Sequence, residues 1–266
     1  MATAVDDTRK QAAIYNGVLE NEEVRAEVKA AVGNMFSPST LEIYAQCPFR
    51  FLGERIWKQS KFVEKEELAA PTDMGTLVHE CLAKFLGKHL QEKLPKYDFA
   101  VLWEELKQEF QNLCDEYIAN GKLLQNELWG AEQKRLLNML YKWLRYEYDM
   151  QGKWDFVPCA VEWAFNNKEG APLRLKLEDG QKFAIMGRVD RIDKNGDKVF
   201  VTDYKLGSVP AVDDLPNGVD LQLPIYLLAA NKLYGKEVAG GGYLSMKEGK
   251  RKNNVKLDAS QEFPFM

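Results

Sequence analysis

The sequence lacks two kinds of segment that would define a class of protein at once. It contains no uncharged apolar run long enough to cross a bilayer, and residues 1–11 lack the apolar core of a secretory signal. It also contains no GxxxxGK[ST] loop that could hold nucleotide phosphates. We therefore expect a cytoplasmic protein that has no membrane partner and does not carry its own ATP motor.

Cysteine is scarce, and charge of neither sign is in large excess. The four cysteines are widely spaced and form no CxxC pair, which argues against a zinc site and a disulfide framework; they are Cys47, Cys81, Cys114 and Cys159. The formal net charge is −4, so the chain as a whole does not attract nucleic acid. Any DNA binding must rest on local basic patches or on metal ions that bridge the phosphates.

The composition of the 266-residue chain, 45% hydrophobic and 29% charged, is typical of a globular protein with one large domain. Apolar spacing divides the chain near residue 155. Helical spacing before this point predicts helices over about 20–32, 97–118 and 129–150, one after the N-cap Ser37, and one from Thr72 or Asp73. Pro48 should kink or divide the helix that follows Ser37.

From Phe156 onward the pattern changes to short strands separated by Gly and Asp turns. The segments VPCAVEWAF, PLRLKL, KFAIMGRVDRID and KVFVTDYK predict a meander of three or more antiparallel strands. Residues 221–235 predict a helix with Pro224 in its first turn, and GGYLSMK predicts the last strand. The chain should therefore combine a helical first half with a sheet-rich second half.

The residues that indicate chemistry lie on two strands joined by an Asn195-Gly196 turn. One strand contains Asp190, and the other ends in Asp203-Tyr204-Lys205. Because side chains alternate along a strand, Asp203 and Lys205 should point to one face and Tyr204 to the other. Val199 and Val201 share the Asp203 face, so this acid should lie in a partly buried site. A buried carboxylate is costly unless a cation or hydrogen bonds compensate it.

Phosphodiester hydrolysis uses groups of this kind. Two carboxylates can hold a hard divalent cation, and a lysine whose pKa is lowered beside the metal can orient or deprotonate the attacking water. The alternative is that Asp190 and Asp193 are turn acids and that Asp203 and Lys205 form an exposed pair. Acids and lysines are common at strand ends, so spacing alone favours this alternative.

Five motifs, taken in order, resemble the RecB-like branch of the PD-(D/E)XK nuclease superfamily. FSPSTLEIYAQCPFRF and MGTLVHECLAKF are similar to the entry motif and the GxxxH helix of the C-terminal nuclease domain of AddB and RecB helicase-nucleases; GRVDRID, VTDYK and QLPIY are similar to its remaining motifs. The resemblance implies an α/β (α+β) fold, in which a central mixed β-sheet is flanked by helices in a restriction-endonuclease-like core with an N-terminal helical region.

The resemblance also implies a domain organisation. Residues 1–35 would be an N-terminal extension or linker, and 36–266 the nuclease domain. Within that domain, 36–155 would be the mainly helical part and 156–246 the catalytic α/β core.

The resemblance further implies roles for individual residues. His79, Asp190 and Asp203 would be metal ligands with the backbone carbonyl of Tyr204, and Lys205 would be the catalytic lysine. Gln222 and Tyr226 would support the site and contact DNA; they are four residues apart, so they share a helix face. A nitrogen ligand beside carboxylates suits Mn²⁺ as well as Mg²⁺.

Glu162 matches an acid that this branch often carries, although an exposed strand residue is an equal alternative. Candidates for DNA contact are Arg188 and a basic run after the last expected strand, which otherwise is a solvated loop; the run contains Lys247, Lys250, Arg251 and Lys252. These residues are the best candidates for phosphate contact outside the metal site.

The sequence departs from the family in its cysteines. Many AddB-like domains hold a 4Fe–4S cluster with the cysteine of the CPFRF motif and three cysteines near the C-terminus, but no cysteine follows Cys159 here. We therefore expect no such cluster. Either the chain is a relative without a cluster or its final cysteines were lost with a truncated C-terminus. As an excised or detached domain, it would have a helicase-like subunit as its partner.

The function expected from these motifs is that of a metal-dependent DNA nuclease, an exonuclease that acts on single-stranded DNA or duplex ends in recombination and repair. A second hypothesis is a catalytically silent module that keeps the nuclease fold and binds DNA or serves as a scaffold in a helicase-nuclease complex. A third is a hydrolase of another phosphodiester, such as RNA.

Overall fold

The computed structural model of the protein describes residues 21–59, 71–211 and 220–256, apart from 167, 169 and 179. Helices form most of the first half of the chain: α2 (Glu22–Val32), α3 (Pro38–Gln46), α4 (Pro48–Phe51), a π-helical turn (Leu52–Ile56), α5 (Pro71–Lys88), a 3-10 turn (Leu94–Lys96), α6 (Phe99–Ala119) and α7 (Trp129–Gln151). Strands and one helix form the second half: β2 (Val157–Phe165), β3 (Leu173–Lys176), β4 (Lys182–Ile185), β5 (Gly187–Asn195), β6 (Lys198–Lys205), α8 (Gln222–Leu233), β7 (Glu237–Ser245) and β8 (Lys250–Lys256). The short strand β1 (Met35–Phe36) precedes α3.

The central sheet has five strands in the order β2-β5-β6-β7-β8. Strands β6 and β7 are parallel and are joined through α8, whereas the other neighbours are antiparallel. Parallel neighbours require a crossover of this kind, while antiparallel ones need only a turn. The sheet is therefore mixed and flanked by helices, as the sequence predicts.

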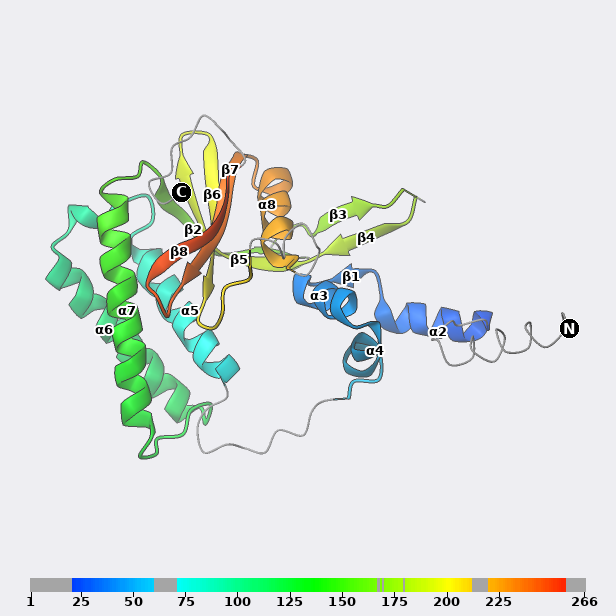
Figure 1. Cartoon of the computed structure of the whole chain (residues 1–266), viewed down its shortest axis with the longest axis horizontal. Coiled ribbons are helices and arrows are strands. Elements are labelled where there is room, and N and C mark those ends of the chain that lie inside the picture. Colours follow the sequence, from blue (N-terminus) through cyan, green and yellow to red (C-terminus); the bar gives the residue numbers. More distant parts are fainter. Residues whose placement is uncertain are drawn as a thin grey trace, which may run out of the picture.

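Helices cover the two faces of this sheet unequally. On one face, α5, α6 and α7 form a layer (Figure 1), and their apolar side chains pack with Tyr204 and Leu244 of the sheet. On the other face, α8 packs against Val199 and Val201 of β6. Tyr204 thus faces α5–α7. The residues directly before and after it on β6 point to the face covered by α8, because side chains alternate along a strand. Among the described residues, no helix is long and apolar enough to cross a membrane.

The helix boundaries follow from local chemistry. The side chain of Ser37 accepts a hydrogen bond from the Thr40 N–H and Pro38 occupies the first position of α3, as expected. That helix ends at Gln46, and Pro48 starts α4, because proline removes a backbone donor and clashes with the preceding turn. The sequence therefore predicts this division correctly.

Two predictions about strands are wrong. The segment KFAIMGRVDRID is two strands in two sheets: β4 joins β1 and β3 in a three-stranded sheet, and β5 joins the central one. The chain changes sheet at Gly187, where a Cβ atom would lie 2.5 Å from Cζ of Phe165. In Figure 1 the hairpin of β3 and β4 projects away from the central sheet.

The second error concerns the end of the sheet. The basic run does not follow the last strand, because it forms the turn after β7 and then β8, which pairs with β7. The segment KRKNNVK contains one apolar residue, so it carries no alternating pattern by which a strand could be recognised.

A network of buried charges joins the sheet to α7. Arg191 of β5 lies 2.8 Å from Oε2 of Glu147 and 2.7 Å from Oδ1 of Asp193, and all three side chains are at most 1% exposed. Arg251 of β8 lies 3.5 Å from Glu147, and the Arg191 guanidinium is 3.4 Å from the Tyr204 hydroxyl. Burial raises the pKa of Glu147, but the charges of Arg191 and Arg251 outweigh it and hold the pKa below its usual range.

Replacement of Arg191 by Met should reduce the free energy of unfolding by about 3–5 kcal/mol, because it removes the nearer of the two cations that pair with the buried carboxylates of Glu147 and Asp193. The matched control is Arg50→Met, which removes an arginine from a half-exposed pair with Glu54 and should lower the free energy of unfolding far less. Urea denaturation followed by circular dichroism measures both. Equal losses in the two variants would contradict the structural role of the network.

Candidate functional site

The site begins where β5 and β6 separate. The pairing of the two strands ends at Arg191 and Thr202, one residue short of Asp190 and Asp203. Beyond this point the Asp190 carboxylate, rather than the β5 backbone, accepts the hydrogen bond of the Tyr204 N–H, at 2.7 Å. The side chain of Asp190 is thereby fixed between the two strands by its Oδ2 atom. Its other oxygen, Oδ1, faces α5.

The carbonyl of Tyr204 faces the same gap. The N–H and C=O groups of one strand residue point to the same edge. The Tyr204 N–H points toward Asp190, and the next carbonyl, that of Lys205, bonds to Met246 N in the opposite direction, at 2.9 Å. The expected carbonyl ligand is therefore on the Asp190 side of β6.

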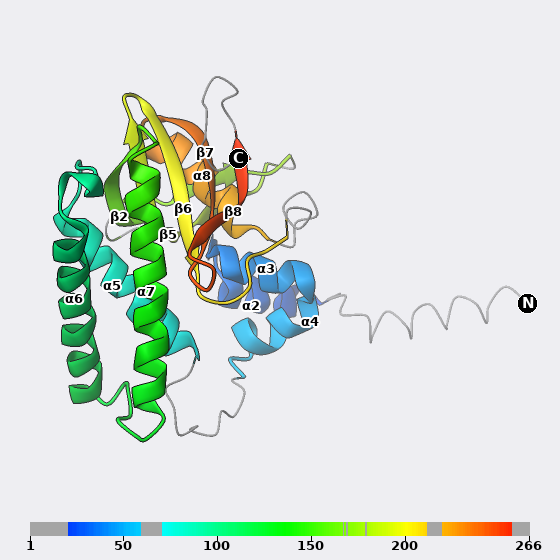
Figure 2. The same ribbon diagram turned by 60° about the vertical axis from the view of Figure 1, so that its left-hand side comes forward.

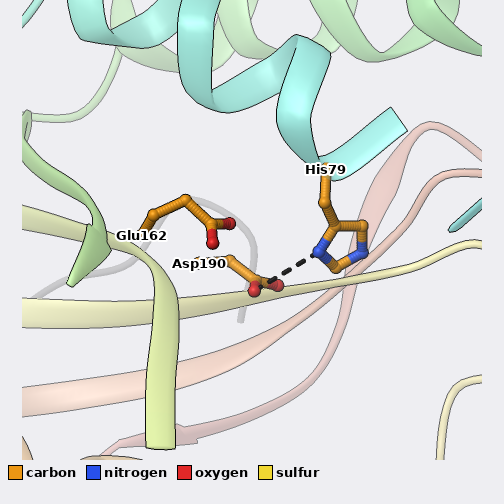
Figure 3. A group of neighbouring side chains, drawn as sticks. All are labelled: His79, Glu162 and Asp190. Atoms are coloured by element: carbon orange, nitrogen blue, oxygen red, sulfur yellow. Dashed lines mark ion pairs between the residues drawn. The ribbon is translucent and has the colours of Figure 1, made fainter. Parts of the chain in front are cut away.

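Three side chains from three elements meet at Asp190. His79 of α5 places its Nδ1 3.3 Å from Oδ1 of Asp190. Glu162 of β2 completes a group whose ligand atoms all lie within 4.8 Å of one another. Figure 3 shows the imidazole descending from α5 toward the two carboxylates, which come from adjacent strands. The motifs favour His79 over Glu162 as a ligand, but both belong to this close group.

The position of Glu162 is strained in two ways. The flanking pairs of Val161 with Arg191 and of Trp163 with Val189 place Glu162 opposite Asp190, and like charges opposite each other destabilise a sheet. Glu162 also has φ +49°, in the left-handed region that L-residues with a side chain rarely occupy. Strain of this kind gathers at functional sites.

The electrostatics of the group favour a cation. Burial lowers the pKa of His79, but the hydrogen bond and charge of Asp190, with the charges of Asp203 and Glu162, raise it to about 9. Burial raises the pKa of Glu162, and the charge of Asp190 adds to this. Burial and Asp190 also raise the pKa of Asp203, although Lys205 opposes them. The site therefore carries an excess of negative potential, and its imidazole and carboxylate donors fit a divalent metal ion.

Asp203 lies beside this group but is held by other partners. Its Oδ2 is 2.9 Å from Nζ of Lys205, and its Oδ1 accepts a hydrogen bond from Nε2 of Gln222 at 2.8 Å. Lys205 also donates to Oε1 of Gln222 at 2.6 Å, and the Gln222 Nε2 lies 3.1 Å from the Tyr226 hydroxyl. Four of the predicted residues are thus joined in one hydrogen-bonded set, with Gln222 at its centre.

In the metal-free site the pKa of Lys205 is raised, whereas the lowered pKa expected from the sequence is that of a lysine beside a bound metal ion. Burial lowers it, but the charge and hydrogen bond of Asp203, with the charges of Asp190 and Asp220, outweigh burial and raise it above its usual value. In this arrangement the ammonium group is a hydrogen-bond donor and a positive charge rather than a base.

Two residues that support the site are not singled out by the sequence. The side chain of Glu42 in α3 accepts hydrogen bonds from the N–H groups of Leu221 and Gln222, both at 3.0 Å, and so caps the N-terminus of α8. Asp220 also accepts from the Gln222 N–H at 3.2 Å and bonds to the Tyr243 hydroxyl. Glu42 lies in a motif that the sequence indicates, but only the fold places it against a helix about 180 residues away.

The candidates for DNA contact separate into two kinds. Arg188 is exposed and lies 3.5 Å from Glu162, and Lys247 and Lys250 are exposed near the β7–β8 turn. Lys252 is partly exposed beside them. Arg251, in contrast, is 6% exposed within the network around Glu147, so its guanidinium does not reach the surface where a phosphate would bind.

A family model described as the PD-(D/E)XK nuclease superfamily matches residues 35–263. The chain belongs to this superfamily, as the order of its motifs predicts. Its relatives include proteins named as subunits of an ATP-dependent helicase/deoxyribonuclease. The one from Carboxydothermus hydrogenoformans is 31% identical over 220 residues, which are 77% of this chain and 19% of the relative.

Two further relatives with the same name are similar in extent. The protein from Clostridioides difficile is 31% identical over 218 residues, 79% of this chain and 18% of its own length. The protein from Clostridium tetani is 29% identical over 208 residues, 72% of this chain and 17% of its own. The chain thus spans about a fifth of the length of the curated relatives it matches.

In metal-free protein, the free energy of unfolding should fall as pH rises from about 6.5 to about 9. The pKa of His79 is raised in the folded state, so the stability it contributes is complete below the pKa of the unfolded histidine and is lost as pH passes the folded value. The shift corresponds to roughly 3 kcal/mol at most. Denaturation in EDTA at several pH values measures it. His79→Gln and Asp190→Asn should each flatten this slope, and an unchanged slope in His79→Gln would refute the assignment.

Proposed function

We propose that this chain is a divalent-metal-dependent deoxyribonuclease that hydrolyses phosphodiester bonds at DNA ends. The observation that carries the proposal is the meeting of two sets of groups at one end of the central sheet. One set is His79, Glu162 and Asp190, and the other joins Asp203 and Lys205 through Gln222. Their combination of hard oxygen donors, a nitrogen donor and a cation matches the requirements of phosphodiester hydrolysis.

The residues that would hold the metal ion are His79, Glu162 and Asp190, with Asp203 and the Tyr204 carbonyl as further ligands from β6. Mg²⁺ and Mn²⁺ both suit this set, because an imidazole beside carboxylates does not exclude either ion. A bound ion would neutralise charge on the phosphate oxygens and lower the pKa of a coordinated water.

Lys205 would act as a donor and a positive charge. As an ammonium group held by Asp203 and Gln222, it can attract the scissile phosphate and orient a water molecule by hydrogen bonding. Gln222 holds Lys205 and Asp203 in register, and Tyr226 orients the Gln222 amide. The cap supplied by Glu42 fixes the helix end from which Gln222 projects.

The names of the relatives support a cellular setting for this chemistry. The curated relatives are named as helicase/deoxyribonuclease subunits, and this chain corresponds to about a fifth of each. We propose that the chain acts with a helicase subunit, as an exonuclease on DNA ends in recombination and repair. The nuclease region would then degrade the strand that the motor delivers.

Asp203→Asn and Lys205→Met should each reduce metal-dependent cleavage of linear DNA by roughly 10²–10³-fold, since each removes a charged group from the reaction centre. The matched control is Lys107→Met, which removes a partly exposed lysine on α6 that pairs with Glu104 and should leave the rate unchanged. Cleavage of end-labelled DNA in Mg²⁺, Mn²⁺ and EDTA measures the effect, and circular dichroism checks the fold.

The wild-type result also separates the nuclease from a silent scaffold. Equal cleavage by wild type and both site variants would mean that the activity arises elsewhere. Calorimetric binding of Mn²⁺ and DNA without any cleavage would favour the scaffold. Cleavage rates on a panel of DNA and RNA substrates would show whether the protein instead hydrolyses another phosphodiester, such as RNA.

A further inference from the structure

Tyr243 of β7 is a buried residue whose ring contacts the ammonium group of Lys205. The Nζ atom of Lys205 lies over this ring, 5.2 Å from its centroid. A cation at this distance from an aromatic face is attracted by the negative potential of the face. Tyr243 is 0% exposed, so it cannot touch a substrate itself. Any effect that it has on the reaction must pass through a neighbour such as Lys205.

The sheet determines where the ring lies. In the parallel pairing of β6 with β7, Tyr243 is opposite Asp203, and Ser245 is opposite Lys205. Paired residues share a face of the sheet, so Tyr243 points to the same side as Asp203 and Lys205. Figures 1 and 2 both show α8 beside β7, and Tyr243 belongs to the apolar cluster that contains Leu223 of α8. The ring therefore lies next to the helix that carries Gln222.

The hydroxyl of Tyr243 is bound by a carboxylate that also holds Gln222. It donates a hydrogen bond to Oδ2 of Asp220, and Oδ1 of the same carboxylate accepts from the Gln222 N–H at 3.2 Å. Asp220 is 5% exposed, and a buried carboxylate requires donors of this kind. The side chain of Gln222 in turn accepts a hydrogen bond from Lys205 at 2.6 Å. One buried acid thus fixes both of the neutral residues that contact the Lys205 ammonium group.

The ring holds the ammonium group without using one of its hydrogen-bond donors. A lysine ammonium has three N–H donors. Among the residues that the structure describes, its acceptors are the Asp203 carboxylate and the Gln222 amide oxygen. At 5.2 Å the ring attracts the charge but is too far away to accept an N–H hydrogen bond. A polar side chain in its place would take the third donor, whereas the ring leaves that donor for a phosphate oxygen or a water molecule.

We propose that Tyr243 is a positioning residue for Lys205. Its ring holds the ammonium group in place and leaves one N–H for the reaction, and Asp220 fixes the ring and Gln222 together. The proposal rests on the proposed nuclease function, which it deepens by assigning how the catalytic lysine is oriented.

The position of the ammonium group is measured by NMR of the whole chain in EDTA, with isotopically labelled lysine. Protons above an aromatic face are shielded, so the Lys205 Hε resonance should lie upfield and show a nuclear Overhauser effect to the Tyr243 ring; Lys205→Met identifies it by its loss. Tyr243→Leu should move it downfield, whereas Tyr243→Phe keeps the ring and should leave it upfield. The matched control Phe110→Leu, which removes a buried ring from α6, should not move it.

The effect on the reaction is measured by cleavage of end-labelled DNA in Mg²⁺. Tyr243→Leu should lower kcat roughly tenfold and leave KM unchanged, because the ring contacts the ammonium group and not the substrate. Tyr243→Phe should retain most of the rate. In Lys205→Met protein, Tyr243→Leu should have no further effect, because the group on which the ring acts is absent. Phe110→Leu should leave kcat unchanged, and circular dichroism checks the fold of every variant.

An equal loss of rate on Tyr243→Leu in the wild-type and Lys205→Met proteins would overturn the proposal, because it would show a structural role alone. A loss in Tyr243→Phe as large as in Tyr243→Leu would also overturn it. So would the absence of the Overhauser effect in the wild type, which decides the geometry even if Tyr243→Leu does not fold. If the wild type never cleaves DNA but the Lys205 resonance responds as expected, the nuclease proposal fails while the positioning of Lys205 by Tyr243 stands.

Discussion

Two carboxylates, Asp190 and Asp203, are buried side by side where β5 and β6 separate, and the rest of the site responds to their charge. Asp190 and Asp203 are 8% and 1% exposed, so water screens them poorly. Glu162 adds a third carboxylate opposite Asp190, at the cost of a left-handed backbone conformation. Burying such charges is favourable only when cations and hydrogen bonds compensate them. Lys205, His79 and the Tyr204 N–H supply part of this compensation, and the remaining negative potential is what a divalent ion would neutralise.

The fold brings these partners from distant parts of the chain. His79 comes from α5 on one face of the sheet, whereas Gln222 comes from α8 at the other. The cap from Glu42 then ties α3 to the start of α8. Behind the site, Arg191 follows Asp190 on β5 and anchors this strand to α7 through Glu147. Strand β5 therefore carries Asp190, whose charge is only partly compensated, and next to it Arg191, whose charge is paired with that of Glu147.

Basic side chains gather at the same end of the sheet. Lys205 ends β6, and a groove that begins after it collects cations from α7 and from the β7–β8 turn. Local charge of this kind can attract a polyanion to a protein of negative net charge, because screening limits the interaction to nearby groups.

The sequence by itself determined the helical and sheet-rich halves, the cap at Ser37 and the helix break at Pro48, and it named Asp190, Asp203, Lys205 and Gln222 as candidate site residues, because periodicity, capping and ordered motifs are local properties of the chain. It did not reveal the change of sheet at Gly187, the strand formed by KRKNNVK, or the burial of Arg251. Those features depend on which segments pair and on what packs against them. Only the tertiary structure decided that Glu162 faces Asp190, that Glu42 caps α8, and that the pKa of Lys205 rises. Each of these depends on distances and burial between residues far apart in the chain, which no local pattern encodes.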